Sequence, residues 1–216
     1  DMSLDGAFLQ DGAGDVSSAG DITTTGDSIA FDGALTLTGD QILNTTSSAA
    51  AGANVSFNST VTGAQSLTVN SGTGGTAAFS NVVGATPLTG LTIDAGATNF
   101  LNTLAVAGNV DIDTVTGRFD NTVQTTGGGS VTVTNSGGLT IYSAADMTLD
   151  GLFNQDGSGA VSTAGDITTS GDNVSFAGPL TLTGNVALAT TSGSASGANI
   201  SIGSSLDGAS TLTVDG

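Results

Sequence analysis

The sequence predicts an all-β protein: a three-sided, right-handed parallel β-helix of about ten coils with no helix. Composition is the first reason, because 34 of the 216 residues are Gly, all 19 acidic residues are Asp, and Arg118 is the only Lys or Arg. Lys and Glu, which commonly cover helices, are absent. A hydrophobic content of 38%, spread along the whole chain, argues against a disordered low-complexity segment. The other two reasons are short alternating triplets and a long internal repeat.

Triplets of the form apolar, polar, apolar follow one another along the chain. Such alternation places two side chains on a buried face and one in solvent, so each triplet is predicted to be a very short strand. The triplets are Ile29–Phe31, Leu35–Leu37, Val55–Phe57, Leu67–Val69, Leu91–Ile93, Leu104–Val106, Val110–Ile112, Val131–Val133, Leu139–Ile141, Met147–Leu149, Val174–Phe176, Leu180–Leu182, Ile200–Ile202 and Leu212–Val214.

Between the triplets lie Gly-Asp, Asn-Ser-Gly and Ala-Gly sequences, which favour tight corners. Triplets start about six to eight residues apart, as at Val131, Leu139 and Met147, so three strands with their corners need about 20 residues. An antiparallel sandwich would use longer strands joined by short hairpins. A parallel β-helix instead absorbs extra residues at its corners, and one coil of three strands fits this spacing.

The long repeat divides the chain into modules. Residues 146–216 align with residues 1–71 without a gap, and about 60% of the aligned positions are identical. Residues 1–145 are therefore interpreted as one long module of about seven coils, and residues 146–216 as the first half of the next copy. We expect a single continuous β-solenoid over residues 1–216, about 45 to 50 Å long.

Aromatic residues recur at about the length of one coil. Side chains that recur once per coil are expected to lie above one another, and we interpret them as a structural Phe stack, with Tyr142 continuing the series. The predicted stack consists of Phe8, Phe31, Phe57, Phe79, Phe100, Phe119, Phe153 and Phe176.

Outward positions offer few candidates for chemistry. Asp111 and Asp113 alternate along one strand, with Asp120 on a following corner, and these three are weak candidates for a Ca²⁺ site. A solvated acidic face is the favoured interpretation, because the nonapeptide of calcium-binding β-rolls is absent. The expected cofactor is therefore none, with Ca²⁺ as the alternative.

Catalysis is not expected. Asp-Gly pairs could suggest glycosidase carboxylates, but Asp before Gly is first a turn residue, and no Trp is present to stack on sugar. The candidate pairs include those that begin at Asp5, Asp11, Asp32, Asp150, Asp156 and Asp207.

Residues 62–79 and 83–96, with their Leu-Thr-Val and Leu-Thr-Ile triplets among Gly, Ala and Asn, resemble the β-strand repeats of giant bacterial surface proteins. Those proteins are similar to adhesins of the filamentous-haemagglutinin and autotransporter types. The resemblance implies a secreted or cell-surface protein with a right-handed β-helix that serves in adhesion or as an extracellular fibre.

The expected function is mechanical: the structural shaft of an extracellular filament or giant surface adhesin. The expected partners are neighbouring modules or further copies joined end to end, with side-by-side bundling as a further option. The net charge of −18 argues against nucleic acid, and the lack of a long apolar segment argues against membrane insertion. The alternative is a binding module that recognises glycan or another fibre through an exposed face. Ice binding is favoured less, because most triplets carry a single outward Thr.

Overall fold

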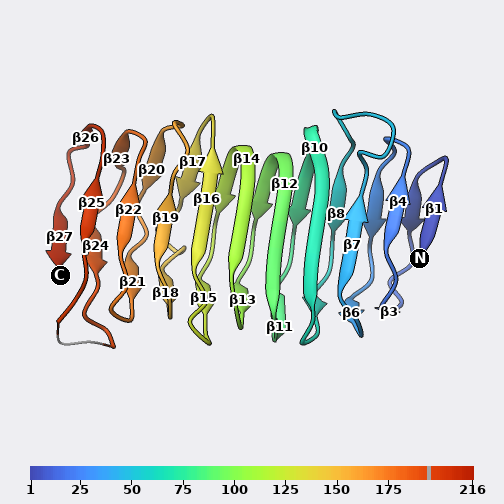
Figure 1. Ribbon diagram of the computed structural model, residues 1–216, viewed down its shortest axis with the longest axis horizontal. Helices are drawn as coiled ribbons and strands as arrows, with labels where there is room; N and C mark the ends of the chain where they lie inside the picture. Colours follow the sequence, from blue (N-terminus) through green and yellow to red (C-terminus); the bar gives the residue numbers. More distant parts are fainter. Residues whose placement is uncertain (194–195) are drawn as a thin grey trace.

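The chain is a right-handed parallel β-solenoid. In the computed structural model, which describes residues 1–193 and 196–216, there are 27 strands and no helix. Figure 1 shows the coils stacked along the long axis, with the two termini at opposite ends. In Figure 1, strands β4, β7 and β16 point up on the near side, and the chain runs back down on the far side. From the N-terminus to the C-terminus the coils advance from right to left, so the coil is right-handed. The predicted fold class is confirmed.

Three columns of stacked strands form the three faces. Face 1 contains β1 (Met2–Leu4), β4 (Ile22–Thr24), β7 (Gln41–Asn44), the first parts of β10 (Ser66–Phe79), β12 (Gly90–Phe100) and β14 (Val110–Phe119), and then β16 (Val131–Asn135), β19 (Phe153–Gln155), β22 (Val174–Phe176) and β25 (Ile200–Ile202). Face 2 contains β2 (Phe8–Gln10), β5 (Ile29–Phe31), β8 (Val55–Phe57), the last parts of β10, β12 and β14, and then β17 (Leu139–Ile141), β20 (Val161–Thr163), β23 (Leu180–Leu182) and β26 (Leu206–Asp207). Face 3 contains β3 (Val16–Ser18), β6 (Leu35–Leu37), β9 (Val61–Thr62), β11 (Val83–Leu88), β13 (Leu104–Val106), β15 (Val123–Thr125), β18 (Met147–Leu149), β21 (Ile167–Thr169), β24 (Val186–Ala189) and β27 (Leu212–Asp215).

Each strand pairs in parallel with the strand one coil later. Strands β10, β12 and β14 bend around the corner between faces 1 and 2, which therefore merge into one 17-stranded sheet, while face 3 is a separate 10-stranded sheet. The ten layers, about 4.8 Å apart, give a rod about 45 Å long. The solenoid is continuous from β1 to β27 through the described residues.

The triplets behave as their alternation predicts. In a typical strand such as β5, β6 or β17, the first and third side chains are buried and the middle one is partly exposed. Outward Thr residues such as Thr68, Thr92 and Thr140 occupy these middle positions. The buried positions join into one hydrophobic core that runs the length of the rod.

Short amide and carboxylate side chains fix the corners. Asp40, just before β7, accepts a hydrogen bond from the Ser66 backbone N–H one coil later at 2.8 Å. A short side chain spans the spacing between layers, which explains why Asp and Asn rather than Glu and Gln dominate these positions. The same contact to a backbone N–H of the next coil is made by Asp1, Asp21, Asn54, Asn109, Asp146, Asp166, Asn173 and Asn185.

Six phenylalanines form a continuous row of ring contacts inside face 2. Their rings contact in sequence, and the closest pairs, Phe57 with Phe79 and Phe79 with Phe100, have centroids 4.7 Å apart and nearly parallel planes. The stack consists of Phe31, Phe57, Phe79, Phe100 and Phe119, and the Phe8 ring contacts Phe31 at its start with the planes tilted by 48°. After Phe119 the next position of face 2 is Ile141, so the stack ends there.

The prediction of one stack through all eight phenylalanines is wrong at its end. Phe153 and Phe176 contact each other, but they lie on face 1, where Phe153 pairs with Val131. Tyr142 does not continue the series, because it comes one residue after the buried Ile141 and points outward, with 45% of its surface exposed. Spacing along the chain predicted the recurrence of these side chains but not the face on which each one lies.

Candidate functional site

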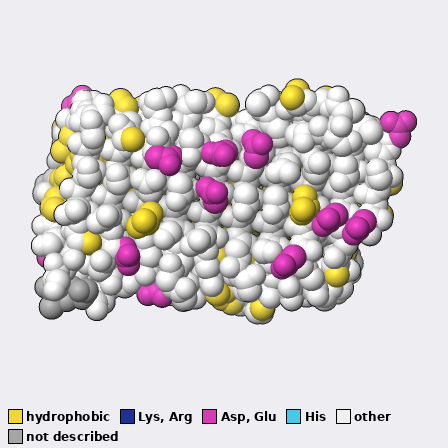
Figure 2. All heavy atoms as spheres, viewed as in Figure 1, with side chains coloured by type: hydrophobic (Ala, Val, Ile, Leu, Met, Phe, Trp, Pro, Cys, Tyr) yellow, Lys and Arg dark blue, Asp and Glu magenta, His cyan; other side chains and the backbone are white. Residues whose placement is uncertain are grey.

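An acidic patch lies in the middle of face 1. We define it by Asp94, Asp111, Asp113 and Asp156. Asp94 and Asp113 are register partners on β12 and β14, and Asp111 lies two residues before Asp113 on the same outer face. Figure 2 shows acidic side chains grouped over the middle of this face, with no basic side chain visible there.

The carboxylates of this patch affect one another. Partial burial raises the pKa of Asp111, and the negative charges of Asp113 and Asp156 raise it further. Asp156 also accepts a hydrogen bond of 2.6 Å from the Thr134 hydroxyl. Negative charges are crowded on this surface, and no cation lies near them. The patch therefore attracts a positively charged partner and repels a second acidic surface.

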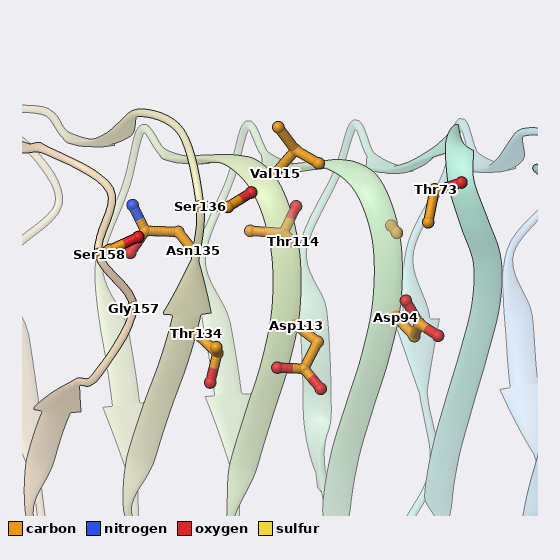
Figure 3. Close-up of a pocket in the computed structure, with 11 residues that line it drawn as sticks. Thr73, Asp94, Asp113, Thr114, Val115, Thr134, Asn135, Ser136, Gly157 and Ser158 are labelled. Carbon is orange, nitrogen blue, oxygen red and sulfur yellow. The ribbon is translucent and has the colours of Figure 1, made fainter.

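A shallow groove of about 300 Å³ borders the patch at the corner between faces 1 and 2. Figure 3 shows Asp94, Asp113 and Thr134 on the strand side of the groove, and Thr114, Asn135 and Ser158 around the corner. The buried amide of Asn135 is already engaged, since it donates to the Gly137 carbonyl at 2.6 Å and accepts from Gln155 at 2.7 Å. The Asn135 amide in this groove is therefore a satisfied structural group, and the remaining polar lining includes the two aspartates and the Ser136 and Ser158 hydroxyls.

The three Ca²⁺ candidates do not come together. Asp111 and Asp113 share the outer face of β14, as expected, but Asp120 lies beyond the far end of that strand, after Phe119 of face 2. There Asp120 forms an ion pair with Arg118. Among residues 1–193 and 196–216, no three Asp, Glu, His or Cys side chains are grouped as a metal site would require.

The Asp-Gly carboxylates act as corner acceptors. Asp150 accepts hydrogen bonds from the Gly128 backbone N–H at 2.7 Å and from the Ser170 hydroxyl at 3.0 Å, and these hold its pKa below the usual value. Asp5 accepts from Thr25, and Asp32 accepts from Asn58 at 2.6 Å. Each of these carboxylates is therefore engaged by groups of a neighbouring coil.

The outward rows of face 1 mix residue types. The row that follows the middle positions of its strands pairs Thr68 with Thr92, and then continues through Asp111, Thr132 and Asn154. The paired threonines of one strand that ice binding would use do not recur coil after coil on this face.

A second groove, at the corner between faces 2 and 3, contains the exposed Tyr142. Arg118 belongs to the coil before Tyr142, and its guanidinium lies 5.0 Å from the centre of the Tyr142 ring. The groove has a volume of about 680 Å³ and extends from Tyr142 over the next two coils. Polar groups surround the ring along this groove. They are Thr140, Ser143, Asp146, Ser162, Asp166, Thr183 and Asn185.

Two features, one in this groove and one on face 1, were missed by the sequence analysis. The exposure of Tyr142 could have been found, because alternation from Ile141 places the next residue outside. The buried amide of Gln155 carries no such signal: it donates to the Gly157 carbonyl at 2.6 Å and accepts from Gly178 at 2.9 Å, inside the rod. In the sequence Gln155 looks like any other polar residue. Its structural role, which is to bond the backbone of the turns inside the rod, is seen only in the folded chain.

No protein-family model, no curated protein and no solved structure matches this chain. In the part of the chain that the structure describes, no helix has the length and apolar character needed to cross a membrane.

Proposed function

We propose that this chain is part of the structural shaft of an extracellular filament or of a giant surface adhesin, with a mechanical and non-catalytic role. The observation that carries the proposal is the unbroken set of hydrogen-bonded columns along the axis of a repeated module. Stability in such a solenoid accumulates from contacts between neighbouring coils, so length is gained by adding modules. The resemblance of residues 62–79 and 83–96 to repeats of bacterial surface proteins supports the same role.

Several properties suit a shaft outside the cell. Backbone hydrogen bonds parallel to the axis, with stacked Phe rings inside, resist stretching in the manner of a cross-β fibril. The net charge of −18 favours a well-hydrated surface that neither binds nucleic acid nor packs against its own copies at low salt.

Electron microscopy of the native material tests this proposal. The expected result is a rod with a layer spacing of about 4.8 Å that continues past the length of this segment. A compact particle with capped ends would contradict the shaft. Labelling of intact cells with an antibody against this segment provides a second test, and surface staining is expected.

A second candidate function is recognition of glycan, and the half-exposed Tyr142 favours it. A half-exposed aromatic ring in a groove with carboxylate, amide and hydroxyl groups is suited to contact a sugar and to bind its hydroxyl groups. A glycan array measured with the wild-type chain, Tyr142→Phe and Tyr142→Ala tests it. Binding that survives in the Phe variant and disappears in the Ala variant would support this function, and an array without signal would exclude it.

A further inference from the structure

We infer that successive copies of the module are turned by one face about the rod axis, so that a tandem array presents each module surface on all three faces in turn. This inference needs only that copies follow one another in the chain, as residues 1–71 and 146–216 do. It therefore stands or falls independently of the mechanical role.

The number of strands per module carries the inference. Seventeen strands precede β18, where the second copy starts, and three of them, β10, β12 and β14, each cover two faces. The module thus contains twenty strand segments, which is one fewer than seven full coils of three. The second copy has to begin one face earlier than the first.

The observed faces agree with this count. The first strand of the first copy, β1, lies on face 1 and pairs with β4, whereas its counterpart β18 lies on face 3 and pairs with β15 and β21. Likewise Phe8 of β2 is on face 2, and its counterpart Phe153 of β19 is on face 1. Each strand of the second copy is displaced in the same direction.

Local structure is nevertheless preserved between the copies. Thr45 and its counterpart Thr190 each donate to a carbonyl eight residues later at 3.0 Å and accept from the same residue's N–H at 2.8 Å. The ring pairs Phe8–Phe31 and Phe153–Phe176 have the same centroid distance of 5.2 Å and the same angle of 48°. Positive φ angles recur at matched glycines, such as Gly63 at 122° and Gly208 at 118°. The corners of the module therefore keep their conformation whichever face the module starts on.

The geometry of an array follows directly. One module of six and two-thirds coils advances the rod by about 32 Å, and the original face returns only after three modules, at about 96 Å. The Tyr142 groove lies where the two copies meet, because it is lined by Tyr142 of the first copy and by Asp146 and Asp166 of the second. A partner that recognises such a surface would find it on every side of the rod, and a second rod lying alongside would meet it once in three modules.

Engineered disulfides test the turn within the chain as it exists, which has no natural Cys. Thr132 and Asn154 are register partners on face 1, so Thr132→Cys with Asn154→Cys should cross-link under mild oxidation. If the second copy kept the face of the first, Asn154, the counterpart of Leu9, would instead follow Thr140 on face 2. Cross-linking of Thr140→Cys with Asn154→Cys, or of neither pair, would overturn the inference. Leu9→Cys with Ala30→Cys, register partners within the first copy, serves as the positive control.

A longer array tests the extrapolation. A chain with residues 1–145 repeated three times before residues 146–216, and with Leu9→Cys in every copy, can be labelled with maleimide gold and imaged by electron microscopy. The labels should advance by about 32 Å per module and change face each time, with the pattern repeating after about 96 Å. Labels in a straight row along one edge would overturn the inference.

A matched array separates strand number from other causes. Insertion of a second copy of residues 139–146 in each module adds one strand and one corner, which brings the module to seven full coils. Its labels should then form a straight row. Labels that still change face in this longer array would overturn the explanation by strand number. If the longer module does not fold, the array of unmodified modules still tests the inference.

Discussion

The first and second copies of the module share their sequence pattern but differ in what covers them. Met2 is 44% exposed in the first coil, whereas its counterpart Met147 is 1% exposed between β15 and β21. At the other end the relation reverses, since Phe57 is buried while its counterpart Ile202 is only partly buried. Conformation is thus a property of the local sequence, and burial is a property of the neighbouring coils.

The largest expected effect concerns burial. Phe153→Ala removes a fully buried ring and should lower the free energy of unfolding by about 3 to 5 kcal/mol, whereas Phe8→Ala, at a partly exposed ring, should cost about 1 to 2 kcal/mol. Urea unfolding followed by circular dichroism measures the two losses. Equal losses would contradict the conclusion that coverage by a coil on each side determines how much a buried side chain contributes to the free energy of unfolding.

The next effect concerns local conformation, which should be the same in both copies. Gly63 and Gly208 have positive φ, and a Cβ at either would lie 2.3 Å from the carbonyl oxygen of Leu37 or Leu182. Gly63→Ala and Gly208→Ala should each cost about 1 to 3 kcal/mol. Hydrogen exchange at the adjacent strands measures both losses. Gly6→Ala is the control, because nothing lies within 4 Å of its Cβ position, and sensitivity at only one of the two corners would contradict shared conformation.

A smaller difference between the copies should appear at acidic pH. The Ser66 backbone N–H lowers the pKa of Asp40, while the counterpart Asn185 makes the same contact to Thr211 without a titrating group. Because the folded pKa lies below the unfolded value, this contribution is present above the unfolded pKa and is lost as the pH falls through the folded pKa. The protection factor of the Ser66 amide should therefore fall as the pH drops below the usual pKa of an Asp carboxyl, whereas that of Thr211 should change less.

Asp40→Asn is the matched variant for this corner. It should make Ser66 behave like Thr211 in the acidic range and leave its protection at neutral pH little changed. A Ser66 amide that keeps the same pH dependence in the variant would show that Asp40 is not the titrating group.

The smallest expected effect concerns association of rods. The acidic patch lies on face 1, with Asp94, Asp111 and Asp113 in the first copy and Asp156 in the second, and the whole chain is strongly negative. Screening by millimolar Ca²⁺ should weaken the repulsion between rods and produce a modest rise in light scattering. The same addition to a variant with Asp94→Asn, Asp111→Asn and Asp113→Asn should give a smaller rise. Scattering that stays flat with the wild-type chain would contradict side-by-side bundling.

Most of the fold could be predicted from short-range pattern. Triplets such as Leu35–Leu37 and Leu139–Ile141 were predicted as strands because in-and-out alternation depends only on adjacent residues. The candidate site was predicted in part. Asp111 and Asp113 lie on one outer face as expected, whereas Asp120 lies with Arg118, because β14 continues around a corner that the sequence does not mark.

The sequence by itself determined the all-β class, the parallel coils, the short strands and the repetition of the module. Only the tertiary structure decided that Phe153 leaves the Phe stack of face 2 and that Tyr142 forms part of a groove between two copies. The physical reason is that the face of a strand depends on the number of corners before it along the whole chain. Strands such as β10 and β12 bend around a corner without interruption, so a count of separate strands or triplets along the sequence misses these corners.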